Sequence, residues 1–207
     1  MKKCVIIGSA PINNYEKIKS HIIDSFIIYC DGGLKHQEAL NVKPDLIVGD
    51  FDSYNKPETD IETIVLPCEK DDTDTFYAVK EAIKRGFDEF ILIGVMGGRL
   101  DHTLGNISML LYLYENDKKA VIVDDYSQIK IIGKESEYIT DDFLYFSLNN
   151  ILGDVKGVNI ENAKYPLKNA EIKASSATCV SNEVIKGQTA KVYINEGIML
   201  LVKVDAN

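Results

Sequence analysis

Short runs of apolar, β-branched residues alternate with helical patterns through the first part of the chain, and this alternation constrains the fold most. Six strands are predicted at residues 4–8, 26–30, 45–48, 63–66, 90–95 and 120–123. Helical patterns follow the second strand as far as Leu40 and occupy residues 73–85 and 104–114. Short buried strands alternating with helices predict an α/β fold, a mostly parallel, Rossmann-like sheet covered by helices.

The pattern changes after residue 132. Residues 133–137 are polar and indicate a linker. Further strands are predicted at residues 143–148, 157–160, 190–194 and 199–204, with glycines between them and no helical period. This half is typical of a small all-β sandwich or barrel. We therefore expect two domains, an α/β catalytic domain at residues 1–132 and a β-sandwich domain at residues 133–207.

The charge balance and the apolar runs exclude several classes of partner. Lys and Arg total 23 against 32 Asp and Glu, a net charge of -9. An acidic chain without a run of basic residues repels a phosphate backbone, so we expect no nucleic acid partner. No apolar run approaches the roughly 20 residues that a membrane span needs. The four cysteines are scattered and are expected to be free thiols, as in a cytoplasmic protein.

Polar residues and glycines follow the predicted strands at the points where these strands end. The groups are Gly8-Ser9, Asp31-Gly32-Gly33, Gly49-Asp50-Phe51-Asp52-Ser53, Lys70-Asp71-Asp72-Thr73-Asp74 and Gly97-Gly98-Arg99-Leu100-Asp101-His102. Ligands of open α/β sheets bind beyond the carboxyl ends of the strands. These groups are therefore expected to converge on one edge of the sheet and to form the active site there.

Asp50 and Asp52 are the first candidates for a metal site. Two residues apart in an extended backbone, they would point to one face, with Phe51 turned into the protein. Carboxylate oxygens that share a face suit Mg²⁺, which keeps its other positions for water or phosphate. The alternative is a solvated acidic turn. Asp74, in the first turn of the next helix, could point back to the same metal.

The remaining groups suit phosphate contacts, and each has a structural alternative. Lys70 could meet a phosphate oxygen, whereas Asp71 and Asp72 either cap the helix or face the nucleotide. Gly97-Gly98 would let the backbone approach a phosphate, and Arg99 could hold it in a fork. Asp31-Gly32-Gly33 is either a plain turn or a contact to nucleotide or metal, and Asp101 either caps its helix or contacts the nucleotide.

Two further polar residues lie on the helix that follows Arg99. His102 is alone, so a surface role is as reasonable as catalysis. Asn106 lies one turn further in an apolar helix, where an amide without a partner would be costly. Its side chain should bind either a backbone group or the nucleotide.

In order along the chain, these motifs resemble those of bacterial thiamine pyrophosphokinases. In the second half, Lys164-Tyr165-Pro166-Leu167 and Ser181-Asn182-Glu183 resemble the thiamine-side motifs of that family. The resemblance implies a homodimer with ATP and Mg²⁺ on the first domain. Thiamine would lie between that domain and the second domain of the partner subunit.

Carried over residue by residue, the resemblance also implies a role for each motif. Mg²⁺ would be bound by Asp50, Asp52 and Asp74, which with Arg99 would form the catalytic set. ATP would be bound by Asp31, Gly32, Lys70, Asp71, Gly98, Arg99, Asp101, His102 and Asn106. Thiamine would be bound by Asp74, Tyr165, Ser181 and Asn182. The chain has no Trp, which leaves open which aromatic side chain stacks on thiamine.

The expected reaction is attack of the thiamine hydroxyl on the β-phosphorus of ATP, which releases AMP. Three other functions remain open at this point. A phosphatase would use Asp50 as its nucleophile, a nucleotide sensor would bind ATP without turnover, and a glycosyltransferase would use the Asp-x-Asp motif for a nucleotide sugar.

Overall fold

The structure is a computed structural model that describes residues 2–52, 57–69, 71–151 and 153–206. The chain divides into two compact units, residues 1–125 and 126–207. This division lies after Asp125, whereas the sequence predicts a domain boundary after residue 132. Residue 133, where the second domain was predicted to begin, instead begins a loop between two strands of the second unit.

The first unit is built on six parallel strands. They are β1 (Lys3–Ile7), β2 (Phe26–Cys30), β3 (Leu46–Gly49), β4 (Thr63–Val65), β5 (Glu89–Ile93) and β6 (Lys119–Val123). Their order is β4-β3-β2-β1-β5-β6, and every neighbouring pair is parallel. The parallel sheet predicted from the alternating pattern is confirmed. The strand order reverses direction at β1, so β1 and β5 flank the point where a crevice is expected.

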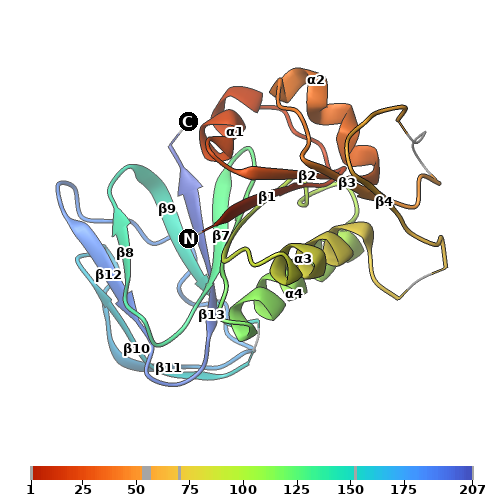
Figure 1. The fold of residues 1–207 in the computed structure, drawn as a ribbon. Coiled ribbons are helices and arrows are strands. Elements are labelled where there is room, and N and C mark those ends of the chain that lie inside the picture. Colours follow the sequence, from red (N-terminus) through yellow and green to blue (C-terminus); the bar gives the residue numbers. More distant parts are fainter. Residues whose placement is uncertain (1, 53–56, 70, 152, 207) are drawn as a thin grey trace. The chain divides into compact units, whose positions relative to one another are not determined.

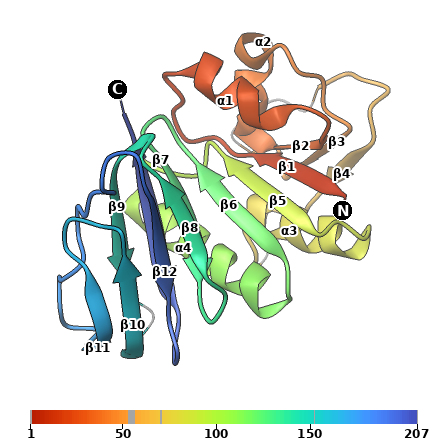
Figure 2. The same cartoon turned by 90° about the vertical axis from the view of Figure 1, so that its left-hand side faces the viewer.

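Helices cover both faces of these strands. The helices are α1 (Tyr15–Ile22), α2 (Gln37–Leu40), α3 (Asp74–Lys84) and α4 (Leu100–Glu115), with a 3₁₀ helix η1 (Asp31–His36) before α2. α1 and α2 lie on one face of the strands, and α3 and α4 lie on the other (Figures 1 and 2). The pattern predicted as helical up to Leu40 is therefore a 3₁₀ helix followed by one α-helical turn. No helix among the described residues is both long and apolar enough to cross a membrane.

The strands of the first unit are buried because helices pack on both sides of them. Val5 and Ile7 belong to a hydrophobic cluster that also contains Ile18 of α1 and Leu40 of α2. Ala78, Val79 and Ala82 are fully buried on α3. Strands buried on both faces need apolar residues at every position, which explains why the sequence shows continuous apolar runs.

The second unit contains only strands among its described elements. They are β7 (Ser127–Ile132), β8 (Glu137–Thr140), β9 (Phe143–Asn149), β10 (Val155–Glu161), β11 (Leu167–Ile172), β12 (Thr189–Tyr193) and β13 (Met199–Asp205). β13 pairs in antiparallel fashion with β7 and β9. A separate antiparallel sheet has the order β11-β10-β12-β8. One hydrophobic cluster draws on both groups of strands, from Phe146 and Leu201 to Ile160 and Val192.

Candidate active site

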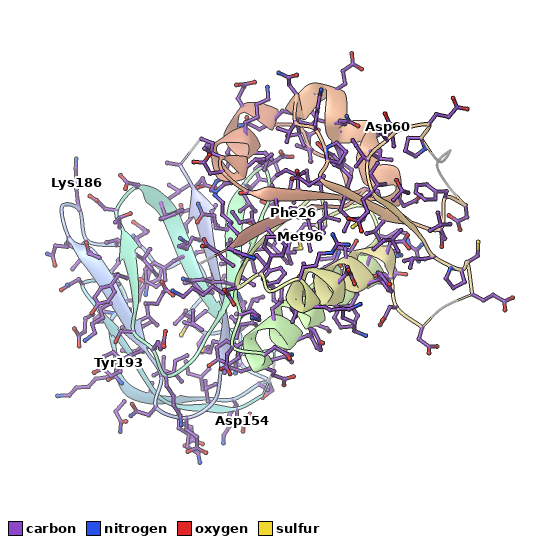
Figure 3. The ribbon with its side chains drawn as sticks, viewed as in Figure 1. Phe26, Asp60, Met96, Asp154, Lys186 and Tyr193 are labelled. Carbon is purple, nitrogen blue, oxygen red and sulfur yellow. The ribbon has the colours of Figure 1, made fainter. Side chains whose placement is uncertain are left out.

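A cavity of about 740 Å³ opens at the carboxyl ends of the parallel strands in the first unit. Its walls come from the segments that follow β1, β2, β3 and β5 and from the start of α3. Figure 3 marks one of these segments with Met96, in the loop between β5 and α4. The predicted residues that line the cavity are Asp31, Gly32, Asp50, Asp52, Asp74, Gly98, Arg99, His102 and Asn106. The expected convergence of strand ends is therefore confirmed.

Three carboxylates lie close together in this cavity. Asp31, Asp50 and Asp74 each offer an oxygen, and these oxygens all lie within 4.8 Å of one another. All three residues are half-buried, and the Oδ1 atoms of Asp31 and Asp74 are fully buried. Negative charges this close repel strongly where water is scarce. A divalent cation would offset that repulsion, and an all-oxygen donor set with open positions suits Mg²⁺.

Close backbone packing brings Asp31 beside Asp50. A Cβ atom on Gly49 would lie 3.1 Å from the Cα of Asp31, and one on Gly33 would lie 2.3 Å from the carbonyl oxygen of Ile7. A Cβ atom at Gly33 would clash with the backbone, and one at Gly49 would force Asp31 to shift by a few tenths of an ångström. Asp31 itself has a φ of 41°, in the left-handed region that residues other than glycine rarely adopt. Backbone strain of this kind is common at functional sites, where the surrounding structure holds it.

The geometry expected for Asp50 and Asp52 is wrong, because the backbone between them is not extended. Phe51 has a φ of 56°, and the backbone N–H of Asp52 donates to Oδ1 of Asp50 at 3.3 Å. Asp52 lines the cavity but is not in the group of three carboxylates. The ring of Phe51 does pack against the hydrophobic cluster of the first unit, as the pattern predicts. Asp31 is the third carboxylate of the group instead. It follows β2, which is the neighbour of β3 in the sheet, and so lies beside Asp50.

The start of α3 fixes the third carboxylate. Thr73 is the N-cap, and its Oγ1 accepts a hydrogen bond from the N–H of Phe76 at 3.2 Å. The cap therefore comes from Thr73, whereas the carboxylate of Asp72 accepts from Lys80 at 2.7 Å. Asp71 is not among the described residues that line the cavity. Lys70 lies outside the described residues, so its predicted phosphate contact stays a prediction.

The loop before α4 presents the cation of Arg99 beside two glycines in left-handed conformations. Gly97 and Gly98 have φ values of 88° and 72°, which only glycine adopts easily. The exposed Arg99 pairs with Asp101 through Nε at 3.1 Å and Nη2 at 2.5 Å. This pairing raises the pKa of Arg99 and lowers the pKa of Asp101 to about 2. Asp101 is thus a partner of Arg99, and it is not among the described lining residues.

Asn106 anchors the end of the β5 segment to α4. Its Nδ2 donates to the carbonyl oxygen of Val95 at 2.6 Å. The backbone group is therefore one partner of this amide, and the contact of Asn106 with the nucleotide stays a prediction. His102, one turn earlier, is exposed and lines the cavity. The bond from Asn106 holds Val95, another lining residue, in place.

Cys30 lies at the base of the cavity beside the carboxylates. Burial raises the pKa of its thiol well above the usual range, and the nearby charge of Asp74 raises it further. A thiol held in its protonated form is a poor nucleophile. Cys30 therefore serves as a small buried side chain at this place, in line with the expectation of free thiols.

A second cavity, of about 310 Å³, lies within the second unit and is mostly apolar. Tyr165 and Asn182 line it. The amide of Asn182 binds both backbone groups of Tyr165, with Oδ1 accepting at 3.0 Å and Nδ2 donating at 2.8 Å. Asn182 is buried, whereas Tyr165 is exposed. Ser181 is exposed, has a φ of 56°, and donates its N–H to Oγ of Ser147.

Comparison with known proteins connects both units to one family. The model of the thiamin pyrophosphokinase catalytic domain matches residues 20–122, and that of the thiamin pyrophosphokinase vitamin B1 binding domain matches residues 132–199. The chain is 30% identical to thiamine pyrophosphokinase of Bacillus subtilis (strain 168), over 98% of this chain and 99% of that protein. The chain belongs to the thiamine pyrophosphokinase family.

Solved structures of the thiamine pyrophosphokinase family share this fold. The Bacillus subtilis enzyme superposes with a TM-score of 0.90 at 24% identity, with complete coverage of both chains. The thiamin pyrophosphokinase of Candida albicans superposes with a TM-score of 0.73 at 16% identity, over 99% of this chain and 89% of that one. The resemblance drawn from the motifs is confirmed, and the chain is a member of a family of enzymes.

The structure adds lining residues that the motifs of this family did not bring forward. Ser9, Pro11, Lys35 and Thr75 also line the cavity of the first unit. The position of Ser9 could be predicted from the sequence, because it directly follows the first predicted strand. Lys35 lies in a segment predicted as an ordinary helix, whereas the structure has a 3₁₀ helix there and bonds Lys35 to the carbonyl oxygen of Ser9, just after β1.

Proposed function

We propose that this chain transfers the diphosphate group of ATP to the hydroxyl of thiamine, forming thiamine diphosphate and AMP. The observation that carries the proposal is the group of Asp31, Asp50 and Asp74, whose oxygens lie within 4.8 Å in the main cavity of the first unit. Membership of the thiamine pyrophosphokinase family supports the same reaction.

We assign Asp31, Asp50 and Asp74 as the ligands of Mg²⁺, with Asp52 beside them in the cavity wall. When bound, the metal would neutralise phosphate charge and fix the phosphate oxygens in space. The left-handed backbone at Phe51 turns Asp52 away from the extended geometry. This assignment replaces Asp52 with Asp31 in the ligand set predicted from the sequence.

Positioning and charge are the contributions we assign to the other residues of the cavity. Arg99 and Lys70 would hold phosphate oxygens, and the N–H groups around Gly98 would add weaker contacts. The hydroxyl of thiamine then attacks the β-phosphorus in line with the departing AMP. Holding two reactants in this geometry supplies much of the rate of such reactions.

Tyr165, Ser181 and Asn182 are the residues that we assign to the thiamine side. The buried amide of Asn182 is occupied by the backbone of Tyr165, so Asn182 acts by positioning that segment. Tyr165 is exposed and is the aromatic residue among the described residues that line the second cavity, so we assign the stacking contact to its ring in a chain without Trp. Asp74 would serve the acceptor as well as the metal.

Four finer expectations also remain proposals. The first unit is Rossmann-like, the second is a β-sandwich, the chain forms a homodimer, and it works in the cytoplasm. The antiparallel pairings and the hydrophobic cluster shared by both groups of strands favour the sandwich. The four free cysteines agree with a reducing compartment. Sedimentation of the purified protein would test the homodimer directly.

The test of function mixes the protein with ATP, Mg²⁺ and thiamine and follows AMP and thiamine diphosphate together. Equal amounts of the two products are expected, and Asp74→Asn should form neither while keeping its fold by circular dichroism. ATP binding without AMP would favour a sensor instead. A phosphorylated Asp50 would indicate a phosphatase, and turnover of a nucleotide sugar a glycosyltransferase.

A further inference from the structure

The described residues that line the cavity of the first unit carry more negative than positive charge, although the proposed site would bind a polyphosphate. Five of these described residues are aspartates: Asp31, Asp50, Asp52, Asp72 and Asp74. The permanent cations among the described lining residues are Lys35 and Arg99. A triphosphate needs positive partners besides a metal ion, since each unscreened carboxylate repels it. The role of each cation therefore matters for nucleotide affinity.

The two cations differ in what already binds them. Arg99 forms two hydrogen bonds with the carboxylate of Asp101, which offsets part of its charge. The ammonium of Lys35 donates to the carbonyl oxygen of Ser9 at 2.5 Å, and a carbonyl carries no net charge. An ammonium group has three N–H donors, so two remain beyond this bond. Lys35 thus keeps its full charge at the cavity wall.

The local fold places Lys35 in the wall of the same cavity as the three carboxylates. Asp31 begins η1, and Lys35 follows four residues later on the same short helix. A Cβ atom on Gly32 would lie 3.3 Å from Cβ of Ser9, so the start of η1 packs directly on the segment after β1. The next residue, His36, binds the carbonyl oxygen of Ala10 through Nε2 at 2.9 Å. The segment that anchors Lys35 is therefore itself held.

We propose that Lys35 is a phosphate-binding residue of this chain. This proposal deepens the proposed function and rests on it. While Lys35 keeps its bond to Ser9, its free N–H donors bind phosphate oxygens of the nucleotide. The pairing is a charge-assisted hydrogen bond, the strong class of such contacts.

The test compares nucleotide binding by Lys35→Met with that of the unchanged protein, by calorimetry in Mg²⁺ and without thiamine. Methionine keeps much of the length of the side chain and removes the charge. ATP affinity is expected to fall about 10- to 100-fold, in line with a lost charged hydrogen bond. Adenosine affinity should stay within about 2-fold, because adenosine carries no phosphate. Lys35→Arg should recover most of the ATP affinity.

Lys43→Met is the matched control, since Lys43 is exposed and is not among the described lining residues. It should bind ATP as the unchanged protein does. Unchanged ATP affinity in Lys35→Met would overturn the proposal. An equal loss for adenosine and ATP would also overturn it, because Lys35 would then only support the wall. The assay for AMP and thiamine diphosphate decides the proposed function separately, since the binding measurement needs no turnover.

Discussion

At the scale of single residues, the proposed metal site takes Asp31 as a ligand in place of Asp52. Asp31→Asn is predicted to lower turnover at least about 100-fold. Even the loss of a residue that only hydrogen-bonds to a metal ligand typically lowers metal affinity or activity about 10- to 100-fold. Asp52→Asn should cost less than Asp31→Asn, since Asp52 is not in the group within 4.8 Å. Initial rates against Mg²⁺ concentration measure both variants. The exposed Asp60 offers a matched control as Asp60→Asn, which should behave as the unchanged protein.

Sequence reasoning found the residue types of this site but could not choose among them. It placed carboxylates after neighbouring strands, and the structure brings Asp31, Asp50 and Asp74 together there. The difference between Asp31 and Asp52 depends on two left-handed backbone positions, Asp31 and Phe51. Residues other than glycine rarely adopt such φ values, so the local sequence pattern does not predict them. The close packing of Gly49 against Asp31 is likewise a contact between neighbouring strands that local sequence does not show.

At the scale of elements, His36 joins η1 to α1 and to the segment after β1. A carbonyl only accepts, so Nε2–H of His36 donates to Ala10, and Nδ1 of the neutral ring accepts from the hydroxyl of Tyr15 at 2.9 Å. Burial lowers the pKa of His36 below its ordinary value of about 6.5, and the charge of Lys35 lowers it too. As the pH falls through this range, His36 therefore binds a proton more readily in the unfolded chain than in the folded protein. The free energy of unfolding that depends on His36 therefore falls as the pH falls.

The comparison of the unchanged protein with His36→Gln isolates this contribution. The unchanged protein should be the more stable of the two near pH 7.5, and its advantage should shrink as the pH falls through about 6.5. Urea unfolding at several pH values measures the difference. An advantage that stays constant or grows on acidification would show that His36 is not held neutral.

The elements themselves could be predicted where the apolar pattern is continuous. The strand predicted at residues 26–30 is β2 as observed, and the helix predicted at residues 73–85 is α3 with its two caps. α1, β7, β8 and β11 were not predicted. β11 lies at the edge of its sheet, and apart from the buried Ile172 its residues are exposed or half-buried without strict alternation, so its apolar pattern is weak. β7 depends on pairing with β13, far along the chain, which local sequence cannot show.

At the scale of the whole molecule, the group of Asp31, Asp50 and Asp74 should lower stability until a cation binds. Two unit charges within 4.8 Å repel by at least about 3.5 kcal/mol at an effective dielectric constant of about 20. Asp74→Asn removes one of the three charges, so in EDTA its melting temperature should exceed that of the unchanged protein. A gain of about 1 kcal/mol corresponds to roughly 2–4 °C for a chain of this size.

Addition of Mg²⁺ should reverse this order. A ligand at about 100 times its dissociation constant stabilises a protein by about 2.7 kcal/mol if only the folded state binds it. Asp74→Asn should lose most of that gain, because its binding group is incomplete, whereas Asp60→Asn should follow the unchanged protein in both conditions. Thermal unfolding in EDTA and in Mg²⁺ measures all three proteins. If Asp74→Asn melts lower in EDTA and gains as much from Mg²⁺, the three aspartates do not form a shared cation site, and the excess charge at this sheet edge needs another explanation.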